Sequence, residues 1–431
     1  MEKQIDNYLD MEPENVARKV RDFQHLLDVA KAMTRIRDLD ELLLYIRETA
    51  MDIADADRCT IFLVDYKTNE LSARFSDQEM KEIRFPLGVG VAGQAAITNT
   101  CINIPDAYAD ERFNPEVDRK TRYRTRSLLT VPLANYEDKI IGVIQIVNKK
   151  HGRAFTEYDE AVLAALGSNA AIAIETAQLL EHYIEKQQIE AELNIAKSIQ
   201  EGLLPLKPPQ VEGYDIFGFS QSADETGGDY FDYFFLPDGR LCSLVGDVSG
   251  HGIGAALLMT SARAYLKGIT QREYHIDKIV AELNSLLERD CSDEKFMTMY
   301  IQALDLKTNK FEYISAGHDQ PLYWRARDKA FFELPPTGIP LGIMHNIKFK
   351  SSEMFSFEKG DYIFISSDGI REAPNAELER FGKKRLNTTL GANAHLDAKE
   401  RGLAVINNVE KFTAGYPQAD DWTMVIMERT S

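Results

Sequence analysis

The sequence predicts a multidomain α+β protein in which two globular domains are joined by one long helix. Its 431 residues exceed the usual size of a single domain, so two or three domains are expected. Strand-like and helical stretches lie on both sides of a proline-free segment rich in Ala, Glu, Gln and Leu. These observations predict an N-terminal domain at residues 14–167, a helical linker at 168–204 and a C-terminal domain at 205–431.

The N-terminal domain begins with helical periodicity and continues with strands. Val16, Val20, Phe23 and Leu27 lie on one helical stripe, and a second helix is expected at 39–54. Runs of β-forming residues follow at 58–64, 70–75, 81–87, 128–133 and 140–147. Helices that flank an antiparallel sheet are typical of an α+β domain.

The linker is predicted to be one long helix that ends before Pro205. Gln187, Asn194 and Ser198 interrupt its apolar seam, so we expect a weak coiled coil that forms a parallel homodimer. The seam has spacings of three and four and includes Leu166, Ala170, Ala173, Ala177, Leu180, Ile184 and Ala191.

The C-terminal domain is predicted to be rich in strands, with helices packed outside. Two helical stretches are expected near 253–267 and 276–289. The strand-like runs lie at 241–245, 299–305, 310–315, 321–325, 361–366 and 422–427.

Composition excludes several classes of protein. A formal net charge of −18 argues against binding to nucleic acid or to anionic membranes. The four cysteines are far apart and form no C-x-x-C pair, which favours a reducing compartment. The N-terminus lacks a signal-peptide pattern, and apolar runs such as 140–147 are too short to span a bilayer. We therefore expect a cytoplasmic protein with no membrane partner.

Aspartates recur in the C-terminal domain where apolar strands meet turns. Asp229, Asp247, Asp368 and Asp420 each occupy such a position. Strand ends bring side chains together at the rim of a sheet, and oxygen ligands suit Mg²⁺ or Mn²⁺. Aspartate in any one of these segments is explained by turn formation alone. Their recurrence in one domain instead favours a metal site.

The segments GGDYFD, LVGDVSGHGIGAALLM, FISSDGI and DDWTMVIM together resemble the PPM-type phosphatases, in particular the RsbU-like or SpoIIE-like bacterial branch. The resemblance covers about residues 200–427. It implies an αββα sandwich and a metal-dependent protein serine/threonine phosphatase. The implied substrate is a phosphoserine or phosphothreonine protein, of the anti-sigma-factor antagonist type.

The same resemblance implies roles for single residues around two Mn²⁺ or Mg²⁺ ions. Asp247 would bridge the ions, and the carbonyl of Val248 would add a ligand to one of them. Asp368 and Asp420 would hold the other ion, whereas Asp229 would act mainly through metal-bound water. Two such ions, about 3.5–4 Å apart, activate a bridging water for in-line attack on phosphorus.

Three further residues remain open. Asp232 is a weaker candidate for the same shell as Asp229. His251 could protonate the leaving serine oxygen, but a structural role in its G-H-G turn is preferred. His318 in the sequence Ala-Gly-His allows the same two interpretations. No arginine near the first motif is available to bind substrate phosphate, which bears on affinity.

The N-terminal domain resembles a GAF domain over its whole length. Asn148-Lys149 followed by Phe155 and Asp159-Glu160 fits the N-K…F-x-x-x-D-E signature of GAF domains from cyclic-nucleotide phosphodiesterases and some bacterial cyclases. The resemblance implies a cyclic-nucleotide ligand. Alternatively, the signature residues stabilise the fold through an ion pair, and the ligand is absent or different.

The GAF resemblance also implies a ligand pocket. Phe75 would stack on the base, and the free amides of a helix beginning at Gly90 favour a phosphate. Gln145 carries an amide that both donates and accepts, which suits adenine and favours cAMP over cGMP. The residues implied to line the pocket are Thr60, Phe75, Val91, Ala92, Asp118, Thr121, Thr125 and Gln145.

The preferred hypothesis is a phosphatase regulated by its GAF domain. One alternative is a non-catalytic ligand-sensing scaffold with a degenerate phosphatase fold. Another is a cyclic-nucleotide phosphodiesterase, which needs a histidine-rich metal site. The eight histidines form no such cluster in the sequence.

Overall fold

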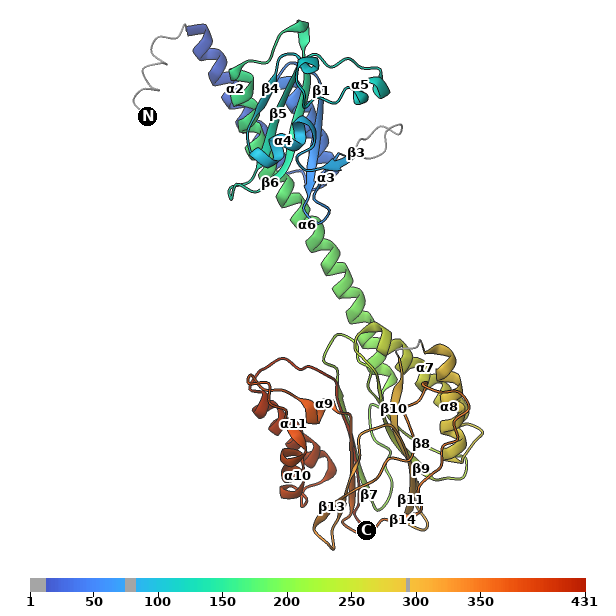
Figure 1. Ribbon diagram of the computed structural model, residues 1–431. Coiled ribbons are helices and arrows are strands. Elements are labelled where there is room, and N and C mark those ends of the chain that lie inside the picture. The colour runs from blue at the N-terminus through green and yellow to red at the C-terminus, as the bar shows by residue number, and fades with distance from the viewer. Residues whose placement is uncertain (1–12, 74–82, 292–294) are drawn as a thin grey trace. The chain divides into compact units, whose positions relative to one another are not determined.

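The computed structural model describes residues 13–73, 83–291 and 295–431 (Figure 1). The chain divides into two compact units, with the boundary between Gln188 and Ile189. One helix, α6 (Glu157–Leu203), begins in the first unit and ends in the second. The predicted fold class, two α/β units on a long helix, is confirmed.

The first unit contains a six-stranded antiparallel sheet in the order β3-β2-β1-β6-β5-β4. Helices α2 (Pro13–Met33) and α3 (Leu39–Ile53) and the first half of α6 share an apolar core with one face of this sheet. Helix α4 (Gly90–Thr98) packs on the other face (Figure 1). The strands are β1 (Ala56–Asp65), β2 (Glu70–Ala73), β3 (Ile83–Pro86), β4 (Ile102–Ile104), β5 (Leu128–Ala134) and β6 (Ile140–Lys149). The short helices are η1 (Ala107–Ala109), α5 (Glu116–Thr121) and η2 (Lys150–Gly152).

Helix α6 starts earlier than the Ser168 that the sequence predicted. The backbone N–H of Thr156 donates to Asp159 Oδ2 at 2.7 Å, which satisfies an amide at the start of the helix. Leu166 and Ala170 are buried in the core of the first unit, with 1% and 0% exposure. The first part of the predicted coiled-coil seam therefore packs within the unit.

Helix α6 is also long and apolar enough to cross a membrane, judged by length and composition over the described residues. Part of its apolar window is buried inside the protein. Leu163 and Ile174, for example, have no exposed surface and belong to the first core. Packing in this unit accounts for the apolar character of that half of the helix.

The second unit is a sandwich of two five-stranded antiparallel sheets, which confirms the predicted αββα architecture. The first sheet has the order β14-β11-β10-β9-β8 and the second β13-β12-β15-β16-β7. Their strands are β7 (Tyr214–Gln221), β8 (Tyr230–Phe235), β9 (Leu241–Val248), β10 (Met297–Asp305), β11 (Lys310–Ala316), β12 (Leu322–Arg325), β13 (Ala330–Glu333), β14 (Phe355–Ser356), β15 (Tyr362–Ser366) and β16 (Trp422–Arg429).

Three apolar layers hold the sandwich together. One core packs α7 (Ile253–Ile269) and α8 (Ile276–Asp290) on the first sheet. A second core lies between the sheets. The third packs the second sheet against α9 (Gly369–Glu372), α10 (Gly382–Ala392) and α11 (Ala398–Thr413) (Figure 1).

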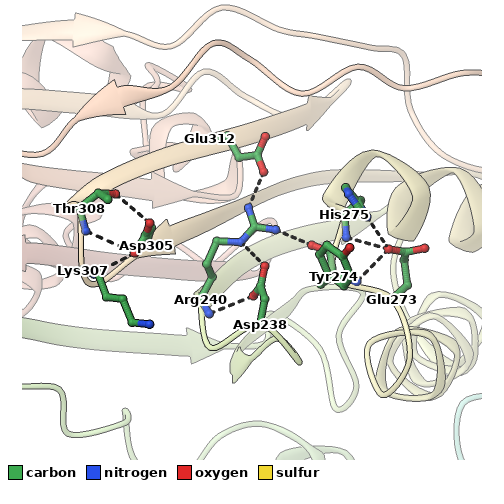
Figure 2. Close-up of polar contacts among 9 residues, drawn as sticks. All are labelled: Asp238, Arg240, Glu273, Tyr274, His275, Asp305, Lys307, Thr308 and Glu312. Atoms are coloured by element: carbon green, nitrogen blue, oxygen red, sulfur yellow. Dashed lines mark hydrogen bonds and ion pairs between the residues drawn. The ribbon is translucent and has the colours of Figure 1, made fainter.

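A polar cluster around Arg240 ties one end of the first sheet to its helices (Figure 2). The guanidinium donates to Asp238 at 2.7 Å, to Glu312 on β11 at 2.5 Å and to the carbonyl of Tyr274 at 2.6 Å. Tyr274 lies between α7 and α8. Since Arg240 lies in the β8–β9 turn, the opposite ends of these two strands remain for the site described next.

Candidate active site

Strand alternation turns Asp229 and Asp247 toward the space between the two sheets. Phe231 on β8 and Val245 on β9 belong to the core between the sheets. Asp229 lies two residues before Phe231, and Asp247 lies two residues after Val245, so each shares that face. Both aspartates lie at the strand ends opposite the β8–β9 turn.

Asp232 faces the other way and does not join this pair. Its carboxylate accepts a hydrogen bond from the hydroxyl of Tyr230 at 2.6 Å and pairs with Lys267 of α7 at 2.6 Å. Tyr230 belongs to the core under α7 and α8. The structure thus gives Asp232 a role between sheet and helix rather than in the predicted metal shell.

The second sheet contributes Asp368 and Asp420. Asp368 follows β15 and is the N-cap residue of α9, and Asp420 precedes β16. Strands β15 and β16 are neighbours, with Ser366 opposite Met424, so both aspartates lie at one end of this sheet. The charges of Asp368 and Asp420 raise the pKa of Asp247. The two sheets therefore bring their carboxylates to the same end of the sandwich.

These carboxylates destabilise one another's charged forms. Burial, followed by the charges of Asp368, Asp420 and Asp421, raises the pKa of Asp247 to about 8. Burial and then the charge of Asp247 raise the pKa of Asp229 well above its usual value. The pKa of Asp368 is also raised, by burial and then by Asp420. For each of these three aspartates, burial and neighbouring carboxylates are the leading causes of the raised pKa.

Divalent cations fit this arrangement chemically. The donors are all oxygens, as Mg²⁺ and Mn²⁺ prefer. Asp229 Oδ2 is buried and has no hydrogen-bond partner in the described part of the chain. Within residues 13–73, 83–291 and 295–431, no three His, Cys, Asp or Glu side chains converge into a compact metal-binding group. Ions at these separated carboxylates would keep several waters, as Mg²⁺ commonly does.

The carbonyl of Val248 lies against the loop that precedes Asp229. The N–H of Val248 donates to the carbonyl of Gly228 at 3.3 Å. A Cβ at Gly228 would lie 2.8 Å from the Val248 carbonyl oxygen, so only glycine leaves this oxygen uncovered. The loop therefore packs closely on the end of β9 next to Asp247.

Two residues that the sequence did not assign hold this loop. Asp421 accepts hydrogen bonds from the backbone N–H groups of Ala223 and Gly228 at 2.8 Å and from that of Asp229 at 3.3 Å. Gln200, near the end of α6, donates to the carbonyl of Gly227 at 2.6 Å and accepts from its N–H at 3.1 Å. The adjacent acidic pair at 420–421 was the sequence signal for Asp421.

His251 is displayed at the surface. Its side chain is 82% exposed, and Nδ1 lies 2.8 Å from Asp224 Oδ2. It belongs to a turn in which Gly250 and Gly252 have positive φ values, immediately before α7. These contacts agree with the structural role that the sequence favoured.

In the first unit, several predicted pocket residues lie on the sheet face covered by α4. Thr60 on β1 is opposite Gln145 on β6, which is opposite Thr130 on β5. Gln145 Nε2 donates to Thr130 Oγ1 at 3.1 Å, so a polar row crosses three strands. Val91 and Ala92 of α4 are buried in two apolar clusters of this unit, one with Ile104 and Leu128, the other with Phe62 and Val143.

The remaining predicted pocket residues differ in what they contact. Asp118 is buried and accepts hydrogen bonds from the N–H and the hydroxyl of Thr125, both at 2.7 Å, and from Tyr108 Oη at 3.0 Å. Thr121 ends α5, and its side chain lies outside the described residues. Phe75 also lies outside them.

The N-K…D-E signature residues make contacts within the fold. Asn148 is buried and left-handed, with φ 55°, and its Oδ1 accepts from the N–H groups of Arg126 and Ser127 at 2.6 and 3.2 Å. Lys149 pairs with Asp159, which caps the start of α6. The signature thus joins the loop before β5 to the first turn of α6.

Comparison with known proteins agrees with this architecture. Residues 237–430 match the stage II sporulation protein E (SpoIIE) family, and residues 38–174 match the GAF domain family. The chain is 30% identical over 247 residues to the phosphoserine phosphatase RsbU of Bacillus subtilis (strain 168), which covers 57% of this chain and 72% of RsbU.

Two further similarities concern parts of the chain. It is 35% identical over 189 residues to the probable 3',5'-cyclic phosphodiesterase pde-5 of Caenorhabditis elegans, covering 41% of this chain but only 26% of that relative. The SiaA-PP2C domain of Pseudomonas aeruginosa superposes with a TM-score of 0.50 at 21% identity, covering 57% of this chain and 99% of that domain. The sandwich, its strand-end carboxylates and the extent of the RsbU match lead to one conclusion: the chain belongs to the RsbU-like, SpoIIE-type branch of the PPM-type protein phosphatases and carries a GAF domain before its catalytic domain.

Proposed function

We propose that the C-terminal domain uses two Mn²⁺ or Mg²⁺ ions to hydrolyse phosphoserine or phosphothreonine in a protein substrate. The supporting observation is that carboxylates from both sheets meet at one end of the sandwich and raise one another's pKa. When bound, such ions activate water and neutralise the charge of the phosphoryl group. The proposed ligands are Asp229, Asp247, the carbonyl of Val248, Asp368 and Asp420.

Two side chains of this protein fix the backbone of the loop that carries Asp229. Asp421 fixes the backbone of Gly228 and Asp229, and Gln200 fixes that of Gly227. These contacts orient the Asp229 carboxylate before substrate arrives, which reduces the reorganisation needed during the reaction. Attack by a metal-activated water requires no covalent enzyme intermediate.

The test is phosphate release from a phosphoserine protein, measured with EDTA, Mn²⁺ or Mg²⁺. We expect no release in EDTA and turnover when either metal is added. A phosphotyrosine protein should be a poor substrate. Turnover that persists in excess EDTA would contradict the proposal. By resemblance to the RsbU-like branch, an anti-sigma-factor antagonist is the first phosphoprotein to try.

We propose a cyclic nucleotide, with cAMP preferred to cGMP, as the ligand of the GAF domain. Gln145 Nε2 already donates to Thr130, which leaves Gln145 Oε1 to accept a hydrogen bond from the amino group of adenine. Isothermal titration calorimetry with both nucleotides tests this. Gln145→Glu should weaken cAMP binding and improve cGMP binding, because a carboxylate suits the two donors of guanine. Binding of neither nucleotide at millimolar concentration would exclude this ligand class.

We also propose that the protein is a cytoplasmic homodimer, with functional parts at 14–167, 168–204 and 205–431. Between its two buried ends, α6 exposes large apolar side chains, including Leu179 (65%), Ile184 (49%) and Ile195 (63%). A second copy of α6 would cover them. Analytical ultracentrifugation should find a dimer for the wild type and monomers for Ile184→Glu. A monomeric wild type at micromolar concentration would contradict this.

A further inference from the structure

His318 is a buried side chain that the proposed mechanism does not use. It is 5% exposed and follows β11, whose residues Phe311 and Tyr313 belong to the core between the sheets. Its Nδ1 lies 2.9 Å from the hydroxyl of Thr298 on β10. Thr298 is directly opposite Asp247 in the β10–β9 pairing, so one end of this contact adjoins a proposed metal ligand.

The other side of the ring approaches the second sheet. Burial lowers the pKa of His318 to about 4, and the nearby backbone of Ser366, two residues before Asp368, partly offsets this effect. Arg371 is the charged neighbour that acts in the same direction as burial. The ring is therefore neutral near pH 7, with one donor and one acceptor nitrogen. Nε2 is buried without a hydrogen bond of standard geometry in the described structure.

The backbone around His318 is held firmly. Ser315 Oγ donates to the carbonyl of His318 at 3.2 Å, and the N–H of Gly317 donates to the carbonyl of Gly338 at 3.0 Å. Gly317 has φ 66°, and a Cβ there would lie 2.3 Å from Pro340 Cγ. A side chain on such a fixed backbone can set the distance between the groups on its two sides.

We propose that His318 is a positioning residue that spans the two sheets and holds Asp247 and Asp368 at the separation that the metal ions require. The inference rests on the proposed metal site. The imidazole contacts Thr298 on one sheet and lies beside the Ser366 backbone on the other, so it links the strand ends that carry Asp247 and Asp368. Because the ring is neutral, it makes this link without adding charge to the site.

The experiment measures Mn²⁺ binding to the full chain by isothermal titration calorimetry. Thr298→Val removes the hydroxyl and keeps the shape, and His318→Leu removes both polar nitrogens. We expect either change to weaken Mn²⁺ binding about 10-fold or more, the range typical for groups that orient metal ligands. The double variant should bind no more weakly than the weaker single variant, because both changes break one bridge. Thr298→Ser, which retains the hydroxyl, should restore binding.

Controls separate this bridge from general effects. Thr308→Val makes the same substitution in the β10–β11 turn, where the hydroxyl donates to Asp305, and should leave Mn²⁺ affinity unchanged. If His318→Leu is unfolded, Thr298→Val alone decides the result. Wild-type Mn²⁺ affinity in Thr298→Val, or weak binding that Thr298→Ser does not restore, would overturn the proposal.

Asp247→Asn distinguishes failure of the inference from failure of the site beneath it. If Asp247→Asn abolishes Mn²⁺ binding while Thr298→Val binds normally, the metal site stands and the role of His318 is refuted. If Asp247→Asn itself binds Mn²⁺ like the wild type, the proposed metal site is wrong, and the bridge falls with it.

Discussion

At the residue scale, Asp421 holds the loop that carries Asp229 through backbone hydrogen bonds. Its Oδ2 accepts from two successive N–H groups, and its Oδ1 accepts from the N–H of Ala223. Asp421→Asn turns one of these oxygens into a donor that faces other donors. We expect turnover to fall about 10-fold or more and the free energy of unfolding to fall by about 1–3 kcal/mol. Asp224→Asn, in an exposed part of the same loop, is the control.

Steady-state kinetics and urea unfolding measure both effects of Asp421→Asn. We expect both effects together, because the same hydrogen bonds order the loop and stabilise the fold. Wild-type turnover in Asp421→Asn would mean that the Gly227–Asp229 loop needs no fixed backbone.

Substitution of His251, unlike that of Asp421, should have little effect on turnover. An imidazole that is 82% exposed and whose Nδ1 faces Asp224 is poorly placed to transfer a proton at a buried site. We expect His251→Gln to keep turnover within about threefold, whereas loss of a general acid reduces it about 10²–10⁴-fold. Turnover measured across pH 6–9 distinguishes these two outcomes. If the decline in turnover at alkaline pH is lost in His251→Gln, then His251 acts as a general acid.

Single residues were predictable where the signal is local. Asp247 lies near the end of apolar strand β9 and Asp368 lies just after β15, and their motifs are contiguous in the sequence. Asp421 and Gln200 were not assigned, because their partners lie 193 and 27 residues away in the chain. Asp232 shares its motif with Asp229 but faces the opposite side of β8, which only the packing of α7 reveals.

At the scale of elements, the last turn of α6 is joined to the catalytic loop through Gln200. This side chain is buried and makes two hydrogen bonds to the backbone of Gly227. Gln200→Met keeps the length of the side chain and removes both bonds. We expect turnover to fall about 5–10-fold with little change in substrate KM, because the loop is loosened while the binding surface is retained. Ser198→Met, at an exposed position of the same helix, is the control.

Kinetics at saturating Mn²⁺ provide the measurement for Gln200→Met. Equal turnover in Gln200→Met and Ser198→Met would show that α6 does not influence the loop through this side chain. Regulation of the phosphatase by its GAF domain through α6 would then need another contact between this helix and the active site.

The Arg240 cluster joins the first sheet to its helices, and its loss should affect stability but not turnover. Arg240→Met removes the shared partner of Asp238 and Glu312, whose side chains are only 30% and 19% exposed (Figure 2). We expect the free energy of unfolding to fall by about 2 kcal/mol, since both carboxylates lose a charge-assisted hydrogen bond. Turnover should be unchanged, because the cluster lies at the opposite end of β8 and β9 from Asp229 and Asp247. Altered turnover in the folded variant would contradict this separation.

Elements were predicted unevenly for physical reasons. The sequence indicated the helices at α7 and α8 and most central strands, where periodicity is strong. It did not indicate α11, which Gly402 weakens as a helix former. That glycine is needed because a Cβ there would lie 2.4 Å from Phe217. Strand β8 was also missed, since Tyr230 to Tyr233 are buried on both faces and show no alternation.

At the scale of the whole molecule, two units share one continuous helix. The start of α6 is fixed by Asp159 and Lys149 in the GAF domain, and its end is fixed by Gln200 in the phosphatase domain. A ligand of the GAF domain can change phosphatase activity through α6 only if the protein has two arrangements of this helix and the ligand binds them with different affinity. The end of α6 before Pro205 and the two-domain organisation followed from the sequence, whereas the earlier start of α6 and the burial of its first half depended on tertiary packing.

The most direct test of the central claim is Mn²⁺-dependent phosphate release from a phosphoserine protein by the full chain, comparing wild type, Asp247→Asn and Asp224→Asn, each with and without cAMP. We expect metal-dependent turnover in the wild type and in Asp224→Asn, a response to cAMP in both, and a loss of at least about 100-fold in Asp247→Asn. Full turnover in Asp247→Asn would contradict the proposed metal-dependent mechanism at the end of the sandwich.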